Sequence, residues 1–162
     1  MSEVASLRPL AAVLVSALAI GLILASHRRP NLREFWTLVV ALAKVAIVGS
    51  MVPGVLDGTV YVTELGAFVD AVDFTLRVDP LGLLFGLLAS GLWVVTSLYS
   101  IGYMRGLDED NQTRYFASFA ASLSATMGVA FAGNLVTLFV FYELLTVATY
   151  PLVAHDESPT AR

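Results

Sequence analysis

A single acidic residue, Glu143, lies near the middle of an otherwise apolar run at residues 135–154, LVTLFVFYELLTVATYPLVA. About 20 apolar residues, rising 1.5 Å each in a helix, span the hydrocarbon core of a bilayer. Glu143 would then lie about 12 Å from the start of the helix, close to the midplane, where a carboxylate costs on the order of 3 kcal/mol. A carboxylate kept at such a cost is by default a functional group.

Two hydroxyl-bearing side chains share the helix face of this carboxylate. Thr146 and Tyr150 follow Glu143 at i+3 and i+7, which places all three on one side of an α-helix. A carboxylate that takes up and releases protons, with hydroxyls stacked beside it, is what a proton path needs. The structural alternative is a Glu that only hydrogen-bonds a neighbouring helix. We expect Glu143 to face protein.

Lys44 is the other charge inside an apolar stretch, and it lies about 12 Å along the helix from Trp36. One reading is a side chain that extends along the helix until its ammonium reaches the surface. The other is a buried cation paired with a carboxylate or a chain of water, which would make Lys44 a further candidate for the ion path. Lys44 is the one buried candidate in the sequence for a partner of Glu143.

The composition indicates a membrane protein. The chain is 57% hydrophobic and 14% charged, with a mean hydropathy of +0.79, whereas soluble domains carry about 25% charged residues. The absence of cysteine excludes disulfides, thiolate metal sites and cysteine nucleophiles. Both histidines fall in loops, and no zinc-protease, serine-hydrolase or phosphate-loop motif occurs. We therefore expect no catalytic residue, no cofactor and no metal, and no enzyme activity from the chain alone.

The apolar runs predict an all-α polytopic membrane protein, a single module over residues 1–162 with about five transmembrane helices. The predicted helices cover residues 9–25, 35–52, 81–104, 115–132 and 135–154, after a short polar lead at residues 1–8. Asp79 and Asn134 are predicted N-caps of the third and fifth helices.

Between the second and third helices, TVYVTEL and DFTLRVD alternate in hydropathy, with Phe74, Leu76 and Val78 on one face. This pattern predicts a short external β-hairpin interrupted at Gly66. Acidic residues gather around it, and we interpret them as an acidic surface rather than a metal site. They are Asp57, Glu64, Asp70, Asp73 and Asp79.

The distribution of arginines predicts the orientation. Arg28, Arg29, Arg33, Arg105, Arg114 and Arg162 fall on one side of the predicted helices, and Arg8 and Arg77 fall on the other. Because basic residues accumulate on the cytoplasmic side, we expect the N-terminus outside and the C-terminus in the cytoplasm of a cell-membrane protein. The fourth helix carries small residues every four positions, such as Ala117, Ala121 and Ala125. Such spacing favours close packing, most simply against the fifth helix.

The segment GNLVTLFVFYELLTVATYPLV, together with RYFASFA and VDPLGLLF, resembles the antiporter-like subunit family. This family comprises the large subunits of Mrp-type cation/proton antiporters and the related proton-pumping subunits of respiratory complex I and membrane-bound hydrogenases. The resemblance covers about residues 74–155. It implies that Glu143 is the family's fifth-helix glutamate, which modulates or passes protons.

The resemblance also implies that the chain corresponds to the N-terminal portion of a longer protein. Full members have about fourteen helices in two inverted repeats that begin at the fourth helix, so the seventh helix and its lysine lie outside this chain. The expected function is the N-terminal part of a proton/cation-translocating subunit, an enzyme component only within a complex I-like oxidoreductase. The expected partners are other membrane subunits, including one that supplies the later helices. The alternative is a non-transporting scaffold or assembly subunit.

Overall fold

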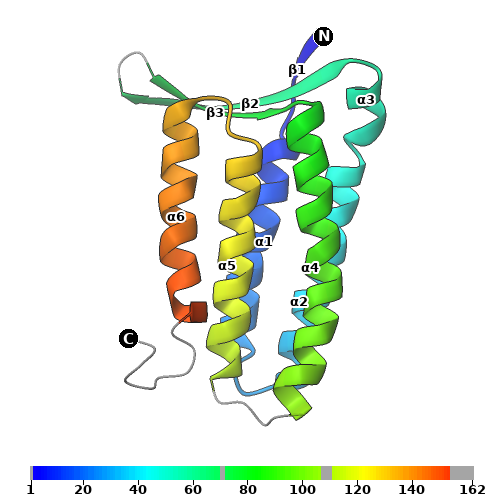
Figure 1. Ribbon diagram of the computed structural model, residues 1–162, viewed down its shortest axis with the longest axis vertical. Coiled ribbons are helices and arrows are strands. Elements are labelled where there is room, and N and C mark those ends of the chain that lie inside the picture. Colours follow the sequence, from blue (N-terminus) through cyan, green and yellow to red (C-terminus); the bar gives the residue numbers. More distant parts are fainter. Residues whose placement is uncertain (1, 70–71, 107–110, 154–162) are drawn as a thin grey trace.

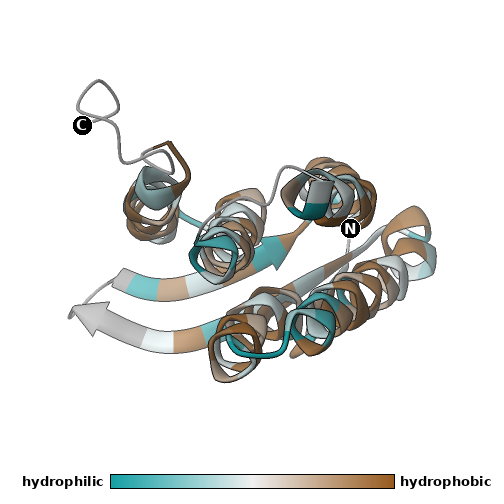
Figure 2. Ribbon diagram, turned by 90° about the horizontal axis from the view of Figure 1, so that it is seen from below, coloured by the Kyte–Doolittle hydropathy of each residue, from teal (hydrophilic) through white to brown (hydrophobic). Residues whose placement is uncertain are grey.

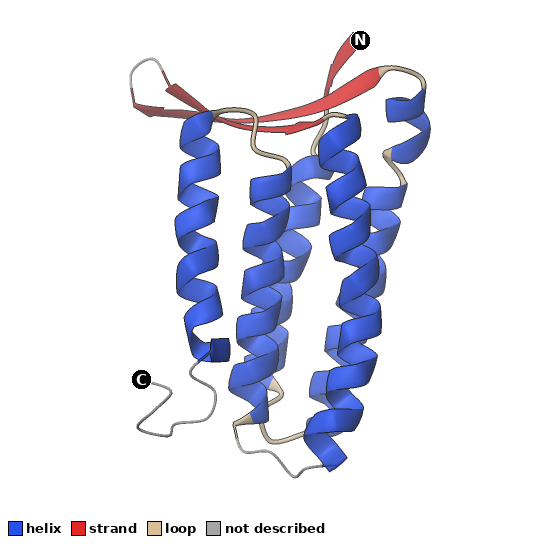
Figure 3. Cartoon of the chain, viewed as in Figure 1, coloured by secondary structure: helices blue, strands red, loops and turns tan. Residues whose placement is uncertain are grey.

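Five long helices stand side by side in the computed structural model, and a three-stranded sheet lies across one end of them (Figures 1 and 3). The structure describes residues 2–69, 72–106 and 111–153. The long helices are α1 (Arg8–Ala25), α2 (Pro30–Gly49), α4 (Pro80–Gly106), α5 (Gln112–Ala130) and α6 (Leu135–Val153), and a short helix α3 (Val52–Leu56) follows α2.

The helices form two layers, with α4, α5 and α6 in one and α1 and α2 in the other (Figure 2). Helix α5 is central and packs against α1, α4 and α6. Helix α6 lies at the edge, where its main neighbours are α5 and strand β3 (Val72–Val78). The edge position of α6 leaves most of its surface without a neighbour in this chain.

Four of the described helical segments are long and apolar enough to cross a membrane: residues 8–25, 30–56, 80–106 and 135–153. Helix α5 is the fifth predicted span, and it is missing from this set because serine, threonine and its polar first turn lower its hydropathy. Its neighbours on three sides shield it, so α5 needs less apolar surface than a helix in contact with lipid. The chain is thus a mostly helical, multi-pass membrane protein.

The prediction of a helical membrane protein with a two-stranded hairpin is incomplete in one respect, because the sheet has three strands. Strand β2 (Thr59–Val69) pairs antiparallel with β3, with Tyr61 opposite Val78, and this is the predicted hairpin. Strand β1 (Ser2–Ala5) pairs parallel with β2, although residues 1–8 were expected to be a polar lead. The four residues SEVA are too short to show a period, and they form a strand because β2 presents an open edge.

The alternation predicted for the hairpin is confirmed. Leu76 and Val78 are fully buried against the helices, and Phe74 packs beside them. Strand β2 continues through Gly66 with a shifted register there, since the positive φ of this glycine, 94°, accommodates a bulge. Gly66 therefore bends the strand and does not end it.

The predicted helix N-caps are also confirmed. The Asp79 carboxylate accepts a hydrogen bond from Gly82 N at 2.7 Å, and the Asn134 side-chain oxygen accepts one from Thr137 N at 2.9 Å. Asn134 also donates from its amide nitrogen to the Asp73 carbonyl at 2.5 Å, which ties the α5–α6 turn to the sheet.

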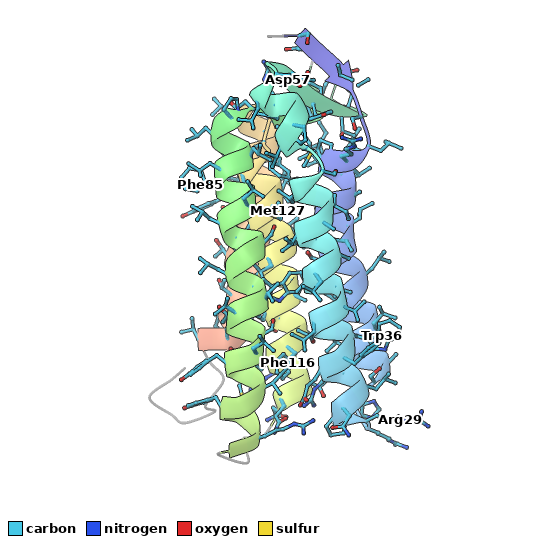
Figure 4. The ribbon with its side chains drawn as sticks, turned by 90° about the vertical axis from the view of Figure 1, so that its right-hand side faces the viewer. Arg29, Trp36, Asp57, Phe85, Phe116 and Met127 are labelled. Atoms are coloured by element: carbon cyan, nitrogen blue, oxygen red, sulfur yellow. The ribbon has the colours of Figure 1, made fainter. Side chains whose placement is uncertain are left out.

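Helix α2 begins at Pro30, earlier than residue 35, because proline suits the first helical position. Figure 4 places Arg29 at the end of the bundle away from the sheet and Asp57 at the sheet end. It also places Met127 and Phe116 inside the bundle at successive levels, and Phe85 outside. Met127 belongs to an apolar cluster beside the sheet and Phe116 to a second one farther from it.

Candidate functional site

Glu143 lies on the exposed face of α6. Its neighbour two positions back, Phe141, is buried against α5 at 9% exposure. Two residues correspond to about 200° around a helix, so Glu143 points away from the surface that Phe141 packs against. Thr146 and Tyr150 are exposed as well, which agrees with the shared face predicted from their spacing.

This face is almost bare in the chain. Of the 18 most apolar consecutive residues of α6, only 6% are buried, whereas the corresponding share is 33% in each of the other three candidate spans. Among the described residues, Glu143 makes no ion pair, and the Thr146 hydroxyl donates to the Tyr142 carbonyl of its own helix at 3.1 Å. The carboxylate and the two hydroxyls therefore form one polar strip on an otherwise apolar surface.

Lys44 is inside the bundle, fully buried between α2, α4 and α5. Its Nζ donates to the Leu123 carbonyl at 3.1 Å and lies 4.6 Å from the centre of the Trp93 ring. The ammonium does not reach the surface, so the side chain is buried and does not extend along the helix to the surface. Among the described residues no carboxylate pairs with it. Lys44 and Glu143 do not meet, because the lysine points into the interior of the bundle while the glutamate faces outward from its edge.

Sequence reasoning missed a buried ion cluster at the end of the bundle away from the sheet. Glu34 is 6% exposed, and its carboxylate accepts two hydrogen bonds from Arg105, at 2.9 Å from Nε and 2.5 Å from a terminal nitrogen. Arg33 lies 3.7 Å from the same carboxylate and donates to Gln112 Oε1 at 2.6 Å and Thr113 Oγ1 at 3.1 Å. These contacts join α2, α4 and α5.

The signal that could have revealed this cluster is Pro30. A proline at the first helical position places Arg33 and Glu34 in the first turns of α2 instead of in a loop. In that position Arg33 contacts α5 and Glu34 contacts α4.

At the sheet, two of the charged residues have local structural roles. Asp79 caps α4, and Arg77 pairs with Glu3 of β1. Asp70 lies outside the described residues. Among the described residues no group of three or more potential ligands could hold a metal ion.

Comparison with known proteins places the chain in a family. The model of the N-terminus of chain 5 of NADH-ubiquinone oxidoreductase (complex I) matches residues 65–116. A probable K(+)/H(+) antiporter subunit from Rhizobium meliloti is 34% identical over 122 residues, which cover 72% of this chain and 12% of that protein. The chain belongs to the antiporter-like subunit family. A Na(+)/H(+) antiporter subunit of Alkalihalophilus pseudofirmus is 34% identical over 103 residues, 63% of this chain and 12% of that protein.

Solved structures share the fold of this antiporter-like chain. The archaeal membrane-bound sulfane sulfur reductase superposes with a TM-score of 0.83 at 16% identity, over 96% of this chain and 32% of that one. The Mrp complex from Dietzia sp. DQ12-45-1b gives a TM-score of 0.72 at 21% identity, over 91% of this chain and 27% of that one. The antiporter-like chain thus spans about a third or less of these structures, and 12% of the two curated relatives above.

Proposed function

We propose that this chain is the N-terminal part of a proton/cation-translocating membrane subunit of an Mrp-type antiporter or complex I-like assembly, with Glu143 in the ion path. Its relatives are named as subunits of K(+)/H(+) and Na(+)/H(+) antiporters and of an NAD(P)H-quinone oxidoreductase. The observation that carries the proposal is the position of Glu143, a carboxylate midway along a membrane helix on a face that this chain leaves bare.

A carboxylate at that depth would cost on the order of 3 kcal/mol against lipid. Protein that covers the face of α6 removes this cost by supplying hydrogen bonds, a cation or ordered water. We therefore expect the later helices of the subunit, or another subunit of the complex, to pack on α6. Both solved neighbours are membrane complexes, which supports partners of this kind.

Thr146 and Tyr150 extend the path from Glu143 toward the end of the bundle away from the sheet. At 1.5 Å per residue, Tyr150 lies about 10 Å beyond Glu143 along the helix. We propose that the hydroxyls of Thr146 and Tyr150 hold water that exchanges protons with the carboxylate. Lys44 belongs to a different part of the bundle, and its role is considered separately below.

We propose that the sheet faces the outside of a cell membrane and that the Arg-rich end faces the cytoplasm. Arg29 and Arg105 lie in or beside the connections at one end, whereas Arg8 and Arg77 lie at the sheet. This partition agrees with the accumulation of basic residues on the cytoplasmic side of membrane proteins.

The test is ion-coupled transport by the intact complex carrying Glu143→Gln. The amide keeps the shape and the hydrogen-bonding groups but cannot titrate, so transport is expected to fall at least tenfold while the complex still assembles. Glu143→Asp, which keeps a carboxyl, should retain part of the activity. Glu64→Gln removes the same charge from an exposed position on the sheet and serves as the control. Transport by Glu143→Gln at the parent rate would show that the carboxylate is structural and favour the scaffold alternative.

A further inference from the structure

Several polar side chains lie inside the helical bundle. The buried face of α2 carries Thr37 and Lys44 in addition to its ion cluster. The buried face of α4 carries three serines, Ser90, Ser97 and Ser100, with Trp93 between them. Polar groups inside a membrane protein are costly, and they commonly mark the paths that ions follow.

Lys44 is the most costly of these groups. Its ammonium has one hydrogen-bond acceptor, the Leu123 carbonyl, and the face of the Trp93 ring. Among the described residues no carboxylate forms an ion pair with it. The nearest charged residues along α2 are Arg33 and Glu34, about 15 Å away along the helix axis. An ammonium can make three hydrogen bonds, so Lys44 is incompletely satisfied by protein.

Within the described part of the chain, two polar groups on α4, those of Trp93 and Ser97, also lack hydrogen-bond partners. Trp93 and Ser97 are both at most 1% exposed, and neither Trp93 Nε1 nor Ser97 Oγ has a hydrogen-bond partner among the described residues. They lie one helical turn apart on the buried face of α4 that packs against α2. Buried donors of this kind are usually satisfied by ordered water, which makes about three hydrogen bonds.

The polar groups continue from Lys44 in one direction. Toward the Arg-rich end lie Ser97 and, farther along, Thr37 and Ser100. The Thr37 hydroxyl donates to the Arg33 carbonyl of its own helix at 3.0 Å, and the Ser100 hydroxyl is hydrogen-bonded to that of Tyr115 at 3.0 Å. The series ends at the Glu34–Arg105 pair, where the Arg105 side chain is 48% exposed.

Toward the sheet the interior closes. The apolar cluster there includes Val48, Met51, Leu83, Met127 and Phe131, all at most 5% exposed. The one buried serine described on that side of Trp93 in α4, Ser90, donates to the Gly86 carbonyl of its own helix at 2.6 Å. The buried polar side chains of α2 and α4 therefore continue from Lys44 toward the Arg-rich end, where they lie beside the second apolar cluster with Val40, Ala41 and Phe116.

We propose that Lys44 is a proton-binding site at the closed end of an internal water-accessible path between α2, α4 and α5, which opens at the Glu34–Arg105 pair and is separate from Glu143. In this site the ammonium gives a proton to path water, leaving a neutral amine and a hydronium ion, and the reverse step reloads it. The groups that face Lys44 from the adjacent helices are the Trp93 ring and the Leu123 carbonyl, neither of which titrates there. The contribution of this site to transport rests on the function proposed above, but its hydration and its protonation do not.

The first test measures hydration with single thiols, since the chain has no native cysteine. In the intact complex in oriented vesicles, Ag+ is added on one side, and its binding is read as protection from maleimide labelling after unfolding. Ser97→Cys and Thr37→Cys should be protected at least tenfold faster from the Arg-rich side than from the sheet side. Ser90→Cys, on the sheet side of Trp93, and Leu98→Cys, on the exposed side of α4, are the matched controls.

The second test measures protonation through Trp93, one of only two tryptophans in the chain. In a Trp36→Phe background, the emission of Trp93 should change with pH as the cation over its ring becomes neutral. Lys44→Met should abolish that change, and any tryptophans of partner subunits cancel in the difference between the two proteins.

Equal silver protection of Ser97→Cys and Ser90→Cys would rule out the path. A pH response of Trp93 that persists in Lys44→Met would rule out Lys44 as the proton site. Neither result depends on transport, so a failure of the Glu143 test leaves both readouts interpretable.

Discussion

The contact between α5 and α6 should break when Gly128 is replaced by alanine. Gly128 faces the ring of Phe141, and a Cβ at this position would fall on three ring carbons, far inside the van der Waals contact distance of about 3.5 Å. Phe141 is 9% exposed and packs 5.6 Å from the Phe74 ring, so a turn of its side chain would break that contact. The helices would have to separate by on the order of 1 Å.

Overpacking of this kind costs about 1–3 kcal/mol. For a chain of this length, each kcal/mol lowers the melting temperature by about 2–4 °C. We therefore expect Gly128→Ala to lower the Tm by about 2–12 °C. Gly91→Ala is the matched control, because a Cβ there meets no atom within 4 Å. It should leave the Tm unchanged or raise it slightly.

The assay is the temperature at which half of the detergent-solubilised complex loses this chain, read by size-exclusion chromatography after heating. A second variant separates the clash from other effects. Phe141→Leu shortens the side chain, so it should cost less stability in the Gly128→Ala background than in the parent, with a coupling of about 0.5–3 kcal/mol. Additive costs for the two substitutions, or equal Tm values for Gly128→Ala and Gly91→Ala, would refute the close approach of α5 and α6.

Two further predictions concern the ends of the bundle. Arg105→Gln should lower the Tm of the complex, because it leaves the buried Glu34 carboxylate without its bidentate partner. Adding Glu34→Gln should recover part of this loss of stability. A double variant that is less stable than Arg105→Gln alone would contradict the pairing. For topology, Val62→Cys in β2 should react with an impermeant thiol reagent from outside the cell, and Arg28→Cys, at the opposite end, only from the cytoplasmic side. Labelling in the reverse sense would invert the proposed orientation.

Local signals in the sequence were sufficient for the elements themselves. The Asp79 and Asn134 caps, the hairpin alternation around Leu76 and the apolar runs of the long helices were all predicted, because each depends on residues within a few positions of one another. The first turns of α2 and the strand β1 were missed. The α2 boundary was obscured because charged residues occupy turns expected to be loop, and β1 because its only support is the edge of β2.

For the candidate site as well, the sequence determined one part and the tertiary structure another. The sequence alone determined that Glu143, Thr146 and Tyr150 share a face, since helical spacing fixes their angular positions. It did not determine which way that face points. The packing of Phe141 on α5 decides it, and turns the carboxylate outward from this chain.

For Lys44 too, the sequence did not determine what the side chain faces. Its place in an apolar run allowed either a surface or an interior ammonium, because a lysine side chain is long enough for both. Only the packing of α2 against α4 and α5 brings Trp93 and the Leu123 carbonyl to its ammonium. The sequence thus determined which residues lie within the long apolar helices, through local periodicity. The tertiary structure decided what each of them faces, because that depends on contacts between residues far apart in the chain.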